Sequence, residues 1–330
     1  MTDDAMASRK PGRAWLLDAA RGLAVVAMVV YHFAWDLSHF GLIETDVAFH
    51  PQWRLFAQSI AASFLMIAGA GLAYASRNGM NWRMFLRRLA IIGGAALAIT
   101  GATYIATPER FIFFGILHCI AVSSVLALVF VRIGWFWSLF AAGAAFQLPG
   151  AVSSALFNHP ALVWIGLGTE APLTNDFEPI FPWFGFMLIG LGVGKYILSR
   201  EQAPDAEHDQ DRGRSGLLAR LGRWSLIIYL VHQPLLFGLF EGAGKLGLIE
   251  TSGEVKAFVQ SCAVDCENSG AAYAVCTAAC SCVARTLRDR PIWQRVVAGK
   301  QFDEDTAELT MVGRRCYDAA APRASSADKP

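Results

Sequence analysis

Four ionisable residues share one face of the first apolar stretch of the sequence: Asp18, Arg21, His32 and Asp36. At about 100° per residue in an α-helix, Arg21 and His32 come within about 20° of alignment. An ionisable group inside a membrane-spanning helix is costly, so such residues mark a pathway or a reaction site. We therefore predict Arg21 as a phosphate ligand and His32 as a general base, separated by about 16 Å along the helix axis. The alternative for Asp18 and Arg21 is a simple ion pair at the entry of the span.

Further polar residues lie in or beside other apolar stretches. His50 precedes a tryptophan in the loop after the first span, and His118 lies within the apolar segment FGILHCIAV. Asp176 and Glu178 stand just before another apolar run, and His232 lies within LIIYLVHQPLL. Histidines from different spans can meet in one cavity. Single histidines can also join helices through hydrogen bonds, and this alternative stays open for His118 and His232.

The elements that position these residues are membrane-spanning helices, each of which needs about 20 mostly apolar residues. The composition favours such helices, because 55% of the 330 residues are hydrophobic and only 17% are charged, against about 25% charged residues in soluble domains. Seven runs qualify: Trp15 to Trp35, Trp53 to Ala75, Phe85 to Ile105, Phe111 to Val131, Ile133 to Leu148, Ile180 to Leu198 and Trp224 to Gly242. The apolar stretch 155–168 contains a proline and is either a re-entrant or interfacial segment or an eighth span. We predict an all-α, polytopic transmembrane helix bundle of seven or eight spans, with a small cysteine-rich helical C-terminal tail.

The loop charges predict the topology. Basic residues gather before the first span, in the connection after the second and in the connection after the sixth, whereas the other connections contain few. The positive-inside rule then places residues 1–14 in the cytoplasm and, with seven spans, the tail 243–330 outside it. Residues 15–242 form the bundle, and within it 201–216 form a charged cytoplasmic linker. The net charge of +1 gives no basic footprint for nucleic acid.

The tail holds six of the seven cysteines. Cys262 and Cys266 are four residues apart, as are Cys276 and Cys280, with Asn-Ser-Gly between the pairs. Two antiparallel helices would place Cys262 opposite Cys280 and Cys266 opposite Cys276, which leaves a third bridge for the remaining pair, Cys282 and Cys316. An oxidising external compartment fits such bridges. The alternatives are a four-cysteine metal site, which normally uses tighter C-x2-C pairs, and free thiols.

Four motifs resemble a known family. They are L-D-A-A-R-G-L-A-V-V-A-M-V-V-Y-H (Leu17 to His32), F-G-I-L-H (Phe114 to His118), D-F-x-P-x-F-P-W-F-G (Asp176 to Gly185) and L-G-R-W-S-L-x-I-Y-L-x-H-Q-P (Leu221 to Pro234). The first resembles the opening helix of polytopic sugar O-acyltransferases. The four motifs occur in this order, and together they resemble the bacterial branch of the heparan-α-glucosaminide N-acetyltransferase catalytic-domain family. The resemblance covers residues 12–240.

The resemblance implies transfer of an acyl group, with acetyl-CoA as co-substrate, to an amine or hydroxyl of an envelope sugar or glycan. It also implies the bacterial inner membrane as the location. The sugar O-acylating relatives point to His32 as the catalytic histidine, whereas the lysosomal relative points to His50. We rank His32 first, because it shares the stripe of Asp18 and Arg21, and we include Asp18 with the catalytic residues.

The remaining predicted site residues follow from the same interpretation. Acetyl-CoA is a polyanion made in the cytoplasm, so Arg21, Arg87 and Arg88 are the expected phosphate ligands; the last two also fit a role as topology anchors. We expect substrate contacts from residues in the later motifs, namely His118, Asp176, Trp183 and His232, and we expect no metal. The alternative function is a transporter or channel for a small polar solute that uses the histidines as a proton relay, and a third is a non-catalytic scaffold whose tail docks partners.

Overall fold

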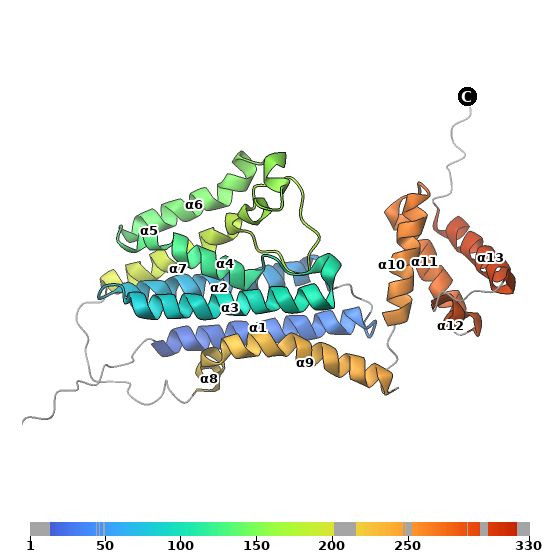
Figure 1. Cartoon of the computed structure of the whole chain (residues 1–330), viewed down its shortest axis with the longest axis horizontal. Helices are drawn as coiled ribbons and strands as arrows, with labels where there is room; N and C mark the ends of the chain where they lie inside the picture. Colours follow the sequence, from blue (N-terminus) through green and yellow to red (C-terminus); the bar gives the residue numbers. More distant parts are fainter. Residues whose placement is uncertain are drawn as a thin grey trace, which may run out of the picture. The chain divides into compact units, whose positions relative to one another are not determined.

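The computed structural model describes residues 14–43, 45, 47–48, 50–200, 216–246, 248, 253–288, 290–297 and 303–321. Residues 1–13 of the predicted N-terminal segment and residues 201–215 of the predicted linker 201–216 therefore lie outside the described residues. The described chain is helical, with one isolated bridge between Phe114 and Phe177. It divides into two compact units (Figure 1): unit 1 is Met1–His32 with Pro51–Leu235, and unit 2 is Phe33–His50 with Leu236–Pro330.

Helices α1 and α9 contribute to both units, and the other helices up to residue 223 belong to unit 1. In chain order the elements are α1 (Ala14–His39), α2 (Pro51–Ser76), α3 (Trp82–Ala106), η1 (Pro108–Arg110), α4 (Ile116–Leu126), α5 (Leu128–Val131), α6 (Trp135–Ala151), η2 (Ala155–Asn158), η3 (Val163–Ile165), α7 (Ile180–Arg200), α8 (Leu217–Arg223) and α9 (Ser225–Lys245). Five of these, α1, α2, α3, α7 and α9, are long and apolar enough to cross a membrane among the described residues. The chain is an integral membrane protein with the predicted all-helical fold class.

The fourth and fifth predicted spans are shorter than the sequence indicates. The fourth becomes α4, which has 11 residues, followed by the four-residue α5, and the fifth becomes the 17-residue α6. Residues 111–115 of the fourth predicted span are not helical, because Asp176 accepts a hydrogen bond from the N–H of Ile116 and fixes the start of α4 there. The stretch 155–168 forms only the short turns η2 and η3, so it contains no helix long enough to be an eighth span.

The core of unit 1 forms where α2 packs against α7. Leu65 on α2 and Leu188 and Leu191 on α7 are almost completely buried. The two backbones approach closely because glycine faces the partner helix: a Cβ atom on Gly190 would overlap the carbonyl oxygen of Met66. Small residues at a helix contact allow this close approach. In a membrane the hydrophobic effect does not drive helices together, so the van der Waals packing of closely approaching helices stabilises their association.

Helix α9 joins α1 and α2 to α3 and α4. On one side Ile228 packs with Val25 and Ile60, and on the other Leu226 packs with Ala96 and Leu117. Helices α1 and α8 touch through glycine, because a Cβ atom on Gly22 would overlap the backbone of Leu218 and one on Gly222 would overlap the backbone of Asp18. This contact holds α8, which leads into α9, against α1.

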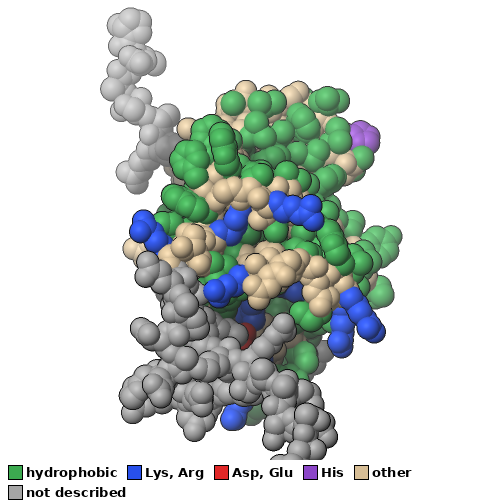
Figure 2. All heavy atoms as spheres, turned by 90° about the vertical axis from the view of Figure 1, so that its left-hand side faces the viewer, with side chains coloured by type: hydrophobic (Ala, Val, Ile, Leu, Met, Phe, Trp, Pro, Cys, Tyr) green, Lys and Arg blue, Asp and Glu red, His purple; other side chains and the backbone are tan. Residues whose placement is uncertain are grey.

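Unit 1 has one end rich in basic residues. In Figure 1 this is the end where α3 begins and where α2 and α7 finish, and Figure 2 shows Lys and Arg side chains gathered on it among hydrophobic ones. Helices α1 and α9 run in the same direction, away from this end. The opposite end of the unit carries η1, η2, η3 and the loop that leads into α7. This arrangement matches the charge asymmetry on which the predicted topology rests.

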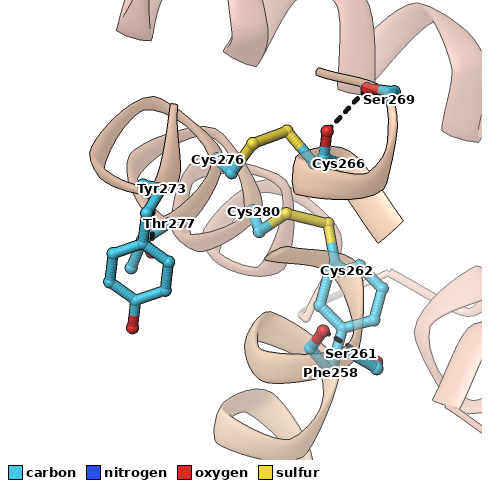
Figure 3. Close-up of a disulfide and its surroundings, with 9 residues drawn as sticks. All are labelled: Phe258, Ser261, Cys262, Cys266, Ser269, Tyr273, Cys276, Thr277 and Cys280. Atoms are coloured by element: carbon cyan, nitrogen blue, oxygen red, sulfur yellow. Dashed lines mark hydrogen bonds between the residues drawn. A yellow bond between two sulfur atoms is a disulfide. The ribbon is translucent and has the colours of Figure 1, made fainter. Parts of the chain in front are cut away.

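Unit 2 contains the helices of the tail: α10 (Gly253–Asn268), α11 (Tyr273–Leu287), α12 (Ile292–Val297) and α13 (Asp303–Ala320). The predicted disulfide pairing is confirmed: Cys262–Cys280, Cys266–Cys276 and Cys282–Cys316. Figure 3 shows the first two bridges joining the helices that flank the turn. Gly270 makes that turn with a φ of 96°, which favours glycine.

The third bridge ties α11 to α13 over an apolar cluster. Leu287, Trp293 and Cys316 are buried in this cluster. The side chain of Arg295 donates two hydrogen bonds, of 2.8 Å and 2.6 Å, to the buried carboxylate of Asp305. The tail is therefore a small folded module with its own core.

Candidate acyl-donor cavity and histidine pair

A cavity of about 530 Å³ opens among α1, α2, α3, α4 and the α8–α9 junction of unit 1. Four arginines line it, from three different elements: Arg21, Arg87, Arg88 and Arg223. The rest of the lining is mostly apolar and includes Ile and Leu side chains of α3 and α4, with Tyr229 of α9. The cavity thus combines a cationic part with an apolar part, as expected for a ligand that has an anionic head and a less polar arm.

The cationic part contains four guanidinium groups. Arg21 donates a hydrogen bond to Asp18 over 3.0 Å, within α1. Arg88 lies close enough to Arg21 for the two guanidinium groups to repel each other. Guanidinium groups held together in this way bind phosphate oxygens well, because each presents several N–H donors in a fixed plane. Arg21, Arg87 and Arg88, which the sequence predicts as phosphate ligands, are therefore brought together.

Arg223 was not predicted as a site residue, because in the sequence it counts only toward the charge of a loop. It ends α8 and lines the same cavity as the other three arginines. The available signal was its position: it directly precedes the apolar run that contains His232. A basic residue just before a span must lie at the mouth of the bundle.

Two histidines of unit 1 stand side by side. The ring centroids of His32 on α1 and His232 on α9 are 4.8 Å apart, and Tyr229 lies 6.0 Å from His232 on the same measure. Nδ1 of His232 is 2.8 Å from the carbonyl oxygen of Tyr229. A carbonyl can only accept, so Nδ1 carries the proton and Nε2 presents its lone pair. Nε2 is buried and has no hydrogen-bond partner among the described residues.

His118 has both ring nitrogens occupied. Its Nδ1 accepts from the N–H of Gly115, and its Nε2 is 3.2 Å from the hydroxyl of Thr100. That hydroxyl donates to the carbonyl of Ile112, so the Nε2–H of His118 donates to Thr100. These bonds tie α3 to the start of α4. A substrate contact by His118 stays a prediction, and the geometry gives this residue a helix-joining role.

Two carboxylates lie at the start of α7. Asp176 accepts from the N–H of Ile116 over 3.1 Å, and the backbone N–H of Glu178 donates to Phe114. Burial raises the pKa of Asp176 to about 6, although its hydrogen bond favours the charged form. Burial, together with the nearby charge of Asp176, raises the pKa of Glu178 to about 9. Glu178 therefore stays protonated at neutral pH, and its Oε2 is a buried atom without a hydrogen-bond partner in the described part of the chain.

The raised pKa of Glu178 predicts how stability changes with pH. The folded protein holds this proton more tightly than the unfolded chain does, so its free energy of unfolding falls as pH rises from 4.5 toward about 9. Between pH 6 and pH 9 we expect a loss of about 4 kcal/mol, or about 10 degrees in Tm. Glu178→Gln keeps a neutral side chain at every pH, so the Tm of this variant should change less between pH 6 and pH 9. The measurement is the Tm in detergent as a function of pH.

The matched control for this prediction is Glu109→Gln. Glu109 lies in η1 and is exposed, so its replacement should leave the pH profile of Tm unchanged. A profile of Glu178→Gln that parallels the wild type across this range would contradict the prediction.

The other predicted residues lie in the core of unit 1 or in unit 2. Trp183 packs against Phe186 in the core of unit 1, with ring centroids 5.5 Å apart. His50 belongs to unit 2 and is exposed, and Asp36 belongs to unit 2 and is buried. Within the described ranges, no group of three or more His, Cys, Asp or Glu side chains could hold a metal ion.

Comparison with known proteins identifies the family. The family described as "Heparan-alpha-glucosaminide N-acetyltransferase, catalytic" matches residues 13–234, which is more than half of the chain. No curated protein and no solved structure matches the chain. The matched region contains the four arginines of the cavity together with His32 and His232. The chain therefore belongs to the heparan-alpha-glucosaminide N-acetyltransferase catalytic-domain family of membrane acetyltransferases.

Proposed function

We propose that the protein transfers an acetyl group from acetyl-CoA to an amine or hydroxyl of an envelope sugar or glycan. The observation that carries this proposal is the arginine-lined cavity inside a bundle of this family. Acetyl-CoA carries several phosphate charges on its nucleotide and a long, uncharged arm that ends in the thioester. A cavity with a cationic mouth and an apolar interior suits both parts.

The donor would enter from the basic end of the bundle. Arg87 and Arg88 of α3 and Arg223 of α8 would hold the phosphates, and Arg21 would join them while its pair with Asp18 fixes its direction. The arm would then run along α9 past Tyr229, which lines the cavity. The proposed orientation has this end in the cytoplasm of a bacterium, where acetyl-CoA is made. The acceptor and the disulfide-bonded tail would then lie on the outer side of the inner membrane.

The transfer itself needs a base near the thioester. The acceptor's oxygen or nitrogen attacks the carbonyl carbon, its proton passes to an imidazole, and the carbon–sulfur bond breaks. The imidazolium returns the proton to the sulfur, which leaves as the free thiol of CoA. His32 is the first candidate base from the sequence, and His50 is the second.

Removing two of the arginines tests donor binding. The double variant Arg87→Ala/Arg88→Ala should raise the Kd for acetyl-CoA by about 100-fold or more, because each charged hydrogen bond to phosphate contributes about 1.5–3 kcal/mol. The measurement is equilibrium binding of radiolabelled acetyl-CoA to the purified protein in detergent. The thermal unfolding of each variant is recorded in parallel.

The control is Arg83→Ala. Arg83 lies on α3 like the other two and is exposed, but it does not line the cavity. If the arginines serve only as topology anchors, the double variant and Arg83→Ala should bind acetyl-CoA as the wild type does. A wild-type protein that binds no acetyl-CoA would refute the proposed function.

A further inference from the structure

We propose that His232 is a catalytic residue of this transfer, the group that takes the proton of the acceptor at its Nε2 atom. This inference rests on the proposed function and adds a residue to it. The supporting observations are the fixed tautomer of His232, its buried and unpartnered Nε2, its position relative to the cavity and its contact with His32.

The tautomer of His232 is the one that a general base requires. Its Nδ1–H donates to the carbonyl of Tyr229 at 2.8 Å, and the carbonyl of Ile228 lies 3.2 Å from the same nitrogen. These bonds hold the ring in place and leave the lone pair on Nε2. In serine hydrolases a carboxylate orients the base through the same nitrogen, and here backbone carbonyls of α9 do so. His32 has no such hydrogen bond in the described structure, so nothing fixes its tautomer.

The free nitrogen is buried. The side chain of His232 is only 8% exposed, and its Nε2 has no partner in the described part of the chain. Leaving a buried acceptor unpaired costs about 1–3 kcal/mol, so a donor from a ligand would bind there favourably. An acceptor hydroxyl or amine has such a donor, and it is also the proton that the reaction must remove.

His232 lies further along α9 than the arginines of the cavity, in the direction expected for the arm of the donor. Tyr229 lines the cavity, and His232, which lies beyond the lining, follows three residues later on α9, about 4.5 Å further from the arginines along the helix axis. A donor held by its phosphates at the arginines would therefore direct its arm toward this histidine. The ring centroid of His32 lies 4.8 Å from that of His232.

The proposed step conserves atoms and charge. The acceptor R–XH, with X an oxygen or an uncharged nitrogen, forms the new C–X bond as its proton moves to Nε2 of His232. The tetrahedral carbon then expels the sulfur with the electron pair of the C–S bond. The Nε2 proton passes to that sulfur, which regenerates neutral His232 and gives acetylated acceptor and CoA thiol.

The test uses His232→Ala and His232→Gly in the full-length protein. The probes are radiolabelled acetyl-CoA as donor and D-glucosamine as acceptor, a sugar that offers both an amine and hydroxyls. We expect kcat to fall by about 100-fold or more, since positioned bases contribute about 10²–10⁴-fold. The Kd for acetyl-CoA should remain within about twofold of the wild type, because no arginine of the cavity changes. Added imidazole should restore part of the rate of His232→Gly by occupying the space of the missing ring.

His159→Ala is the matched control, because His159 is an exposed histidine of the same unit and should leave kcat unchanged. If an alanine or glycine variant fails to fold, His232→Gln keeps a polar side chain of similar size and takes its place. Transfer at the wild-type rate by a folded His232 variant would overturn the inference while the proposed function stood. A wild type that binds no acetyl-CoA would instead refute the proposed function itself.

Discussion

Replacing Gly190 by leucine is expected to prevent unit 1 from folding. A side chain at this position would overlap the backbone of Met66 on the facing helix, and a backbone atom cannot move aside as a flexible side chain can. Extra methylene groups in a packed core cost about 1–3 kcal/mol, and occasionally more. Separating α2 from α7 would also open the apolar core around Leu65 and Leu191. We therefore expect a loss well above about 4 kcal/mol. The measurement is the yield of monodisperse protein after detergent extraction, together with its Tm.

Gly93→Leu provides the control for this prediction. Gly93 lies within the membrane-spanning helix α3, and a Cβ atom there would meet nothing within 4 Å. This variant should extract and unfold as the wild type does, because its new side chain faces open space. Normal yield and Tm for Gly190→Leu would show that α2 and α7 do not pack through this glycine.

Removal of the Cys282–Cys316 bridge is expected to destabilise the tail by about 4 kcal/mol. The bridged residues are 34 positions apart in the sequence, so the bridge closes the longest loop of the three. It also holds α13 over the cluster that contains Leu287 and Trp293. In Cys282→Ser/Cys316→Ser the protected amides of α11 and α13 should exchange with solvent roughly 1,000-fold faster. Hydrogen exchange with mass spectrometry on the full chain measures this locally.

The bridge between Cys266 and Cys276 gives a graded comparison. It spans 10 positions, and the same loop-closure relation predicts a smaller loss of about 3 kcal/mol for Cys266→Ser/Cys276→Ser. The two double variants should therefore rank by loop length. If exchange in α13 does not change when the longer bridge is removed, the apolar cluster alone must hold this helix in place.

Much of the fold follows from patterns within single segments. The long apolar runs predict α1, α2, α3, α7 and α9, because a membrane requires each helix to satisfy its own backbone hydrogen bonds. The cysteine pairing was also predictable. A spacing of four residues puts two cysteines on one helix face, and the intervening turn folds the two helices together, which leaves few ways to join them.

The candidate site was predictable from the sequence only in part. The arginines Arg21, Arg87 and Arg88 were predicted from charge and position, since their role depends on one end of the bundle being basic. The sequence allowed histidines of different spans to meet, but it did not indicate that His32 and His232 form the pair, because they are 200 positions apart and meet only when α9 packs against α1. The occupied nitrogens of His118 likewise depend on Thr100 of another helix.

The sequence by itself determined the positions of the five long apolar helices, the basic end of unit 1 and the pairing of the tail cysteines, because these depend on composition and short-range spacing. Only the tertiary structure decided that Arg223 joins the cavity, that α4 starts late at Ile116 and that His232 keeps an open nitrogen beside His32. Each of these depends on a contact between residues far apart in the chain. Such contacts depend on how whole helices pack, and no local pattern encodes this packing.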